Sequence, residues 1–132
     1  MKLFTDVAPL EKGIDAAWMR NQVISNNIAN VDNPGFKSSK VEFESVFKAA
    51  LSGRGIDAKK TRDGHRSFGS GAENVSASVV QNSNTTMRHD GNNVDIDYES
   101  AELAKNTIYY NTLVQKISSE FRRLSMAINE GK

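Results

Sequence analysis

The stretch SNNIANVDNPGFK, from Ser25 to Lys37, marks the end of a predicted helix and decides how the rest of the chain is organised. Asn26, Asn27 and Asn30 crowd the last turns of that helix. Asparagine is a poor residue in a helix interior, because its short amide competes for the backbone's own hydrogen bonds. The density of amides therefore indicates a role other than stabilising the helix.

The residues that follow predict a turn of defined geometry. Asn33 precedes a proline, which disfavours helical geometry and pushes the residue toward an extended conformation. Pro34 suits position i+1 of a type II turn, and Gly35 supplies the positive φ that position i+2 requires. Together with Phe36, these residues predict that the chain leaves the helix in one fixed direction.

Upstream of the turn, apolar residues recur at alternating spacings of four and three, which is the pattern of a coiled-coil seam. The pattern predicts a helix from about Pro9 to Asn30, with the proline in the first turn, where it is tolerated. The seam of this helix includes Leu10, Ile14, Asn21, Ile24 and Ile28.

The C-terminal segment shows the same spacing and predicts a second helix from about Tyr98 to Glu130. Asp97 is its expected N-cap, and Arg122 and Arg123 lie near the end where positive charge complements the helix dipole. The seam of this helix includes Leu103, Tyr110, Val114, Ile117, Phe121, Leu124 and Ile128.

The middle of the chain differs sharply in composition, because six of the nine glycines lie between Ser52 and Asn93. The alternation at Val75, Ala77 and Val79 predicts a short strand, which would pair with residues 85–87 as a weak hairpin. Residues 41–51 predict a short amphipathic helix. We therefore expect a mainly α protein, in which residues 1–37 and 95–132 pair as a coiled-coil core and residues 38–94 form an irregular insert.

Composition excludes several classes of function. The 132 residues carry a formal net charge of +1, so the chain lacks the basic excess typical of nucleic-acid binding. It has no cysteine, and neither His65 nor His89 has a companion at ligand spacing. The acidic run that begins at Asp90 fails as a calcium loop, since Asp95 stands where the loop needs glycine. We expect no catalytic centre, cofactor, metal site or small-molecule substrate.

Both predicted helices carry apolar residues outside their seams. Trp18 lies well off the first seam, and Ile108 lies off the second. One interpretation is a bundle inside one subunit, with a third helix covering these residues. The other is that each helix packs against several copies, in contacts that do not close and so build a filament. In that case Asn21, Asn26 and Asn30 would fix the register between subunits, as a buried asparagine does in a coiled coil.

Two motifs resemble those of the bacterial flagellar rod, hook and axial-protein family. The first is the opening stretch from Ser25 to Lys37, preceded by Ala17, Arg20 and Gln22. The second runs from Gly91 to Asp97 and continues through Glu99, Ala101, Glu102, Leu103, Ala104, Lys105 and Asn106, with Tyr110 and residues 113–115 most similar to the proximal-rod members. Asn33 replaces a common threonine and Ser100 a frequent methionine, and neither change upsets the turn or the helix.

The resemblance implies a structural subunit that the flagellar type III export apparatus delivers without a cleaved signal peptide. Such a subunit would polymerise in the periplasm through its terminal helices, next to other copies, other rod proteins, and the basal-body membrane ring or its adaptor. It also implies that the helices are largely disordered in the free monomer. Two other classes stay open from the residues: a cytosolic coiled-coil adaptor or export chaperone, and a cell-wall enzyme using the carboxylates between Asp90 and Glu99.

Overall fold

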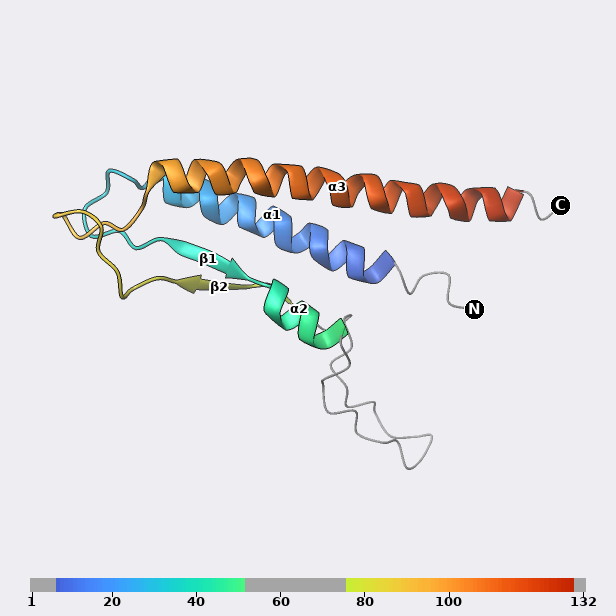
Figure 1. Ribbon diagram of the computed structural model, residues 1–132, viewed down its shortest axis with the longest axis horizontal. Helices are drawn as coiled ribbons and strands as arrows, with labels where there is room; N and C mark the ends of the chain where they lie inside the picture. Colours follow the sequence, from blue (N-terminus) through green and yellow to red (C-terminus); the bar gives the residue numbers. More distant parts are fainter. Residues whose placement is uncertain (1–6, 52–75, 130–132) are drawn as a thin grey trace, which may run out of the picture.

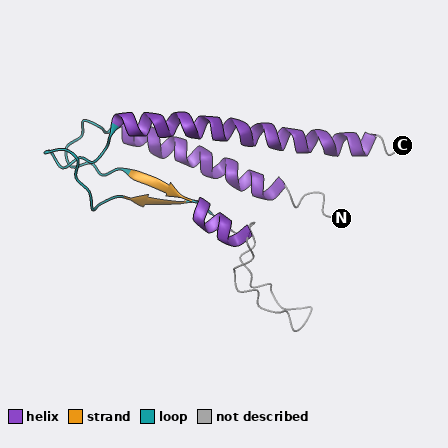
Figure 2. Cartoon of the chain, viewed as in Figure 1, coloured by secondary structure: helices purple, strands orange, loops and turns teal. Residues whose placement is uncertain are grey.

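The computed structural model describes residues 7–51 and 76–129. Its elements follow the order α1 (Val7–Ala29), β1 (Ser39–Glu42), α2 (Glu44–Leu51), β2 (Ser78–Gln81) and α3 (Ile96–Asn129). Figure 1 shows α1 and α3 side by side, with α3 running beyond the start of α1. The two strands lie along α1 (Figure 2). The predicted mainly α fold, with two long helices packed against each other, is confirmed.

Both long helices form close to where their heptads predict them. α1 begins at Val7, two residues before the predicted start, and Pro9 lies in its first turn. α3 begins at Ile96 because its N-cap is Asp95 and not the predicted Asp97. The Asp95 carboxylate accepts hydrogen bonds from the backbone amides of Asp97 and Tyr98, at 3.0 and 3.2 Å.

The short elements depart from the prediction. The segment predicted as one helix over residues 41–51 starts as strand β1 and becomes helix only at Glu44. Val41 and Phe43 alternate with the exposed Glu42, and this period of two buries both apolar side chains in the same core.

The predicted hairpin is also wrong. β2 pairs antiparallel with β1, from Ser39 opposite Gln81 to Glu42 opposite Ser78, and not with residues 85–87. Val75 lies outside the described residues.

A small apolar core holds the sheet against α1. Ala16, Val41 and Phe43 are buried together, and Met19, Val23, Phe47 and Ala77 pack around them. The rings of Phe43 and Phe47 stack with centroids 4.8 Å apart. Part of the insert predicted over residues 38–94 thus contributes to the same core as the first helix. None of the described helices combines the length and apolar character needed to cross a bilayer.

Candidate assembly site

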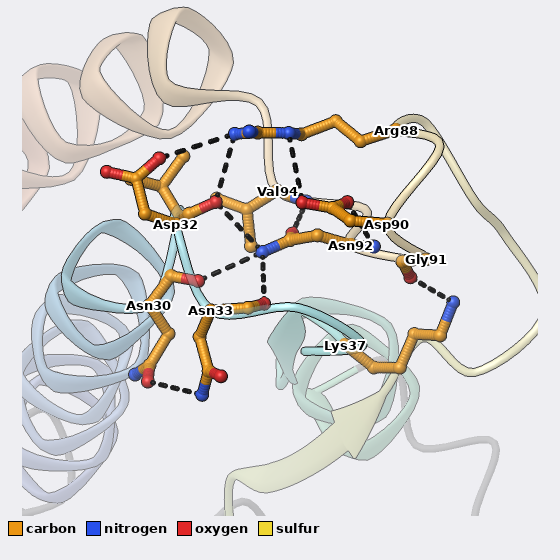
Figure 3. Close-up of polar contacts among 10 residues, drawn as sticks. Asn30, Asp32, Asn33, Lys37, Arg88, Asp90, Gly91, Asn92 and Val94 are labelled. Atoms are coloured by element: carbon orange, nitrogen blue, oxygen red, sulfur yellow. Dashed lines mark hydrogen bonds and ion pairs between the residues drawn. The ribbon is translucent and has the colours of Figure 1, made fainter.

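Asn92 ties the end of α1 to the loop that precedes α3. Its side-chain Nδ2 donates to the main-chain oxygens of Asn30, Val31 and Asn33, at 3.0, 2.9 and 2.9 Å (Figure 3). Its Oδ1 accepts from the backbone amide of Val94 at 2.7 Å, and the residue is fully buried. The amides of Asn30 and Val31 already bond the last carbonyls of α1, so the Asn92 amide satisfies the carbonyls of the turn that follows the helix.

Asn93 makes a second set of bonds on the other side of the same loop. Its Oδ1 accepts from the backbone amide of Ser38 at 2.6 Å, and its Nδ2 donates to the carbonyl of Asn82 at 2.7 Å. Nδ2 also donates to the Thr85 hydroxyl at 2.9 Å. We call Asn92 and Asn93 the asparagine clamp, because together they fix the segments before β1 and after β2.

Two glycine turns pack against each other beside the clamp. Gly35 has a φ of 72°, and the amide of Phe36 donates to the carbonyl of Asn33 at 3.2 Å, which is the geometry of the turn predicted at Pro34. Gly91 has a φ of 84°, and the Gly35 amide donates to the carbonyl of Asp90 at 2.9 Å. Both turns require positive φ, which glycine adopts without strain.

Two charged side chains on the solvent side of the asparagine clamp bond main-chain carbonyls of the two turns. Lys37 donates through Nζ to the carbonyls of Thr85 and Gly91, each at 2.8 Å. Arg88 donates to the carbonyl of Val31 at 3.2 Å and lies 3.4 Å from the Asp32 carboxylate (Figure 3). The Arg88 pair is exposed and contributes little stability by itself. The buried amides, and not the ion pairs, hold the two turns together.

The contact between α1 and α3 combines small residues with amides. A Cβ placed on Gly13 would lie 3.3 Å from Cδ1 of Leu113, so the glycine allows close approach of the helices. Asn106 is 3% exposed, and its Nδ2 donates to the carbonyl of Ala17 and to Oδ1 of Asn21, both at 2.8 Å. Asn21, predicted to fix the register between subunits, thus binds α3 of its own chain.

Asn27 joins three elements with one side chain. It is 1% exposed, its Oδ1 accepts from the backbone amide of Ser39 at 3.0 Å, and its Nδ2 donates to the Ser39 carbonyl at 2.8 Å. The same Nδ2 donates to Oε1 of Glu99 at 3.1 Å. The side chain therefore completes the outer edge of β1 and also binds the carboxylate of α3.

Burial raises the pKa of Glu99 above its ordinary value. Loss of hydration is the main cause, and the nearby carboxylates of Glu102 and Asp95 act in the same direction. The hydrogen bond from Asn27 opposes them by favouring the charged form. A negative charge on this side chain is therefore held at a cost in stability.

We expect Glu99→Gln to stabilise the helix pair at neutral pH. Because the folded-state pKa is raised, the carboxyl contributes its stability fully below the unfolded pKa and loses it as pH rises through the folded pKa. Glutamine keeps an oxygen for Asn27 and removes the charge. In a helix titration by circular dichroism, from urea through buffer into trimethylamine N-oxide, the midpoint should shift toward urea at pH 7 and match the parent near pH 4. The exposed Glu11→Gln is the matched control, and an equal gain there would contradict this explanation.

The residues predicted to pack between subunits are mostly only partly covered in the single chain. Ile24 is buried, whereas Trp18, Phe121 and Ile128 are 57%, 51% and 73% exposed. Asn26 is exposed, and Asn30 donates to its carbonyl and side-chain oxygens at 2.8 and 3.1 Å. The half-buried members are Leu10, Ile14, Asn21, Ile28, Asn30, Leu103, Tyr110, Val114, Ile117 and Leu124.

Sequence reasoning chose Asn21, Asn26 and Asn30 but overlooked the amides with the most buried bonds. Those are Asn27, Asn92, Asn93 and Asn106. Two of them, Asn92 and Asn93, form a doublet shortly before the α3 cap, but asparagine is also common in solvated turns, so the doublet alone did not identify them. Their partners are main-chain groups far away in sequence, which no local pattern identifies.

A model of the family described as flagella basal body rod protein matches residues 19–37, which span the end of α1 and the Pro34 turn. The flagellar basal body rod protein FlgB of Bacillus subtilis (strain 168) is 36% identical to this chain over the whole length of both. This chain belongs to the FlgB family of flagellar basal body rod proteins.

Other members of the family match along most of their length. FlgB of Borreliella burgdorferi is 33% identical over 87% of this chain and 89% of the relative. FlgB of Aquifex aeolicus is 30% identical over 97% and 96%. The resemblance drawn from the two motifs is therefore confirmed. The geometry adds that in this FlgB-family chain the asparagine clamp joins those two motifs in space.

Proposed function

We propose that this chain is a structural subunit of the flagellar basal body rod and assembles through its two long helices with further copies and with other rod proteins. One observation supports the proposal independently of family membership. The helix pair leaves large apolar side chains exposed to solvent along its length. Trp18 is 57% exposed on α1, while Ile108 and Ile128 are 69% and 73% exposed on α3. A two-helix unit cannot cover them, whereas neighbours in a polymer can.

The small core supports the same proposal. The buried apolar residues that the structure describes are Ala16, Ala17, Ile24, Val41, Phe43 and Val94. Burial of so few side chains offsets little of the conformational entropy of two long helices. Contacts between subunits would supply the remainder, so that folding of α1 and α3 is coupled to assembly.

The remaining parts of the proposal rest on the family. Residues 1–37 and 95–132 would form the inner core of the rod, in which Asn26 and Asn30 set register between subunits. The chain would be exported by the flagellar type III apparatus without a cleaved signal peptide and would act in the periplasmic part of the basal body, beside the membrane ring or its adaptor. Its role would be mechanical, without a catalytic step. Membership of the FlgB family does not favour an adaptor or export chaperone.

Amide hydrogen exchange tests the coupling of folding to assembly. In the dilute full-length monomer, amides of α1 and α3 are expected to exchange fast, because the isolated pair is marginally stable. In isolated basal bodies the same amides should be protected by several orders of magnitude.

Two results would contradict the proposal. Strong protection in the monomer would mean that the helices already possess a complete core and would revive the adaptor interpretation. Absence of the chain from isolated basal bodies would reject the rod function itself.

A further inference from the structure

One face of α1 is turned away from both α3 and the sheet. Exposed residues recur along it at alternating spacings of four and three, which is the periodicity of a seam between helices. We call it the outer face of α1, and its members are Glu11, Asp15, Trp18, Gln22, Ser25 and Ala29. Trp18, in the middle of this face, is 57% exposed. The described part of the chain thus leaves most of its ring accessible to a helix from another molecule.

α3 has an outer face of the same kind, on the side turned away from α1. Its exposed positions follow the same spacing and are Ala101, Ala104, Ile108, Asn111, Gln115 and Ser118, with Arg122 at the next position. Ile108 is 69% exposed. The two alanines before it leave room for a large side chain from a partner helix, because the approach of two helices depends on the size of the side chains at their contact.

The two outer faces lie at the same height in the molecule. The register between the antiparallel helices is set by three contacts, which join Gly13 with Leu113, Asn21 with Asn106, and Asn27 with Glu99. In this register Trp18 lies at the height of Ile108, and Ser25 lies at the height of Ala101. A second copy in the same orientation therefore presents its outer face of α3 at the correct height without moving along the helices.

The sheet does not obstruct such an approach. Ala16 and Val23 hold the sheet against α1, and both point away from the side of the helix that carries Trp18. Figure 1 shows β1, β2 and α2 together on one side of α1. A neighbouring copy can thus place its α3 beside α1, with the two helices antiparallel as they are within one chain.

The apolar parts of the two faces are complementary in size. Opposite Trp18 the next copy presents Ile108 and, one turn away, the small Ala104. The indole would cover the isoleucine and fill the space above the alanine. Contact between the copies would therefore remove two large exposed apolar side chains from water.

The polar parts of the two faces match as well. Glu11 and Asp15 are exposed acids that have no ion pair within residues 7–51 and 76–129. In the same register they lie opposite Gln115 and Asn111, whose amides donate hydrogen bonds to carboxylates. Arg122 lies about two turns beyond Gln115 and also has no ion pair in the described part of the chain. Side chains on a helix lean toward its N-terminus, so Glu11 and Arg122 on antiparallel helices lean toward each other.

We propose that the outer face of α1 in one copy packs against the outer face of α3 in the next copy, with the two copies side by side at the same height. The proposal rests on the rod function proposed above and names the faces that join neighbouring copies. Because the two partners use different faces, each copy keeps a free face for a further neighbour. Copies therefore add around a common axis and stay in one layer.

Crosslinking in assembled structures tests the contact and its register. The chain has no cysteine, so introduced cysteines report only the chosen positions. Cells would express two full-length variants together, Ser25→Cys and Ala101→Cys, and isolated basal bodies would be treated with a short bis-maleimide. We expect a crosslinked dimer from this pair and none from either variant alone. Ser25→Cys with Ser118→Cys is the matched control, because Ser118 lies on the same face about 25 Å further along α3.

Two sets of substitutions then test the side chains that form the contact. Trp18→Ala should lower the yield of the dimer several-fold. Met87→Ala removes an exposed apolar side chain from a loop outside both faces and should leave the yield unchanged. Glu11→Arg and Arg122→Glu should each lower the yield, and the two together should restore it, because opposite charges then face each other again.

Any of four results would overturn the contact and leave the rod function standing, provided that the chain is present in the basal bodies. These are no dimer above the control, a dimer from the displaced pair instead, a full yield after Trp18→Ala, or no recovery after the charge exchange. Basal bodies that lack the unsubstituted chain would reject the rod function, and the contact with it.

Discussion

Asn27→Ala is expected to lower the free energy of unfolding of the helix pair by about 4 kcal/mol at neutral pH. The substitution removes three hydrogen bonds at once, two to the backbone of Ser39 and one to the carboxylate of Glu99. The carboxylate would stay buried without a donor, which is the most costly of the three losses. The loss should shrink toward pH 4, where Glu99 becomes protonated.

The measurement is a helix titration of the full-length protein by circular dichroism, from urea through buffer into trimethylamine N-oxide, which stabilises compact states. Asn26→Ala provides the matched control, because it removes the neighbouring amide on the exposed face of the same helix. That variant should raise helix content in the monomer, since alanine is the better helix former. Equal losses in the two variants would contradict the role assigned to Asn27.

Asn92→Ala is expected to cost about 3 kcal/mol and to release the end of α1 from the loop before α3. Three carbonyls lose a shared donor, and the amide of Val94 loses its acceptor, in a place closed to solvent. In isolated basal bodies, hydrogen exchange should rise first in the last turn of α1 and the first turn of α3. Cells that carry the variant should show a clear reduction in swimming-ring diameter.

Asn84→Ala controls for the general effect of losing an amide near β2. Its side chain is exposed and accepts one weak bond from the hydroxyl of Ser83, at 3.4 Å. It should leave both exchange and swimming unchanged. Unchanged exchange in Asn92→Ala would mean that water replaces the clamp without loss, and the assigned role would be wrong.

The heptads were sufficient to place both long helices within about two residues, because helix periodicity is a local property of the sequence. The cap of α3 was misplaced because Asp95 and Asp97 have the same capping chemistry, and only tertiary position distinguishes them. The strand at Ser39–Glu42 was missed for a different reason. Its partner lies beyond residue 75, and Phe43 also fits one face of a helix with Val46, Phe47 and Leu51.

The candidate assembly site also contains residues that the sequence predicts and residues that only the fold reveals. Exposed apolar residues such as Trp18 could be anticipated from their place outside the seam. The buried amides could not, because each side chain bonds backbone groups that the fold brings near, as Asn106 does with Ala17. Glu99 looked like one of several acidic residues in the first turns of a helix, and its burial follows from the approach of β1 and α1.

The asparagine clamp also determines the order in which this chain can fold during synthesis. The turn after α1 finds a donor for the Asn30 and Val31 carbonyls at Asn92, more than 60 positions later, and the helix that packs against α1 begins only at Ile96. A nascent chain that has emerged as far as β1 therefore has a turn with unsatisfied carbonyls and a helix with an uncovered side, and the intervening loop must close before either finds its partner. The N-terminal half consequently gains little from folding before the last third of the polypeptide exists.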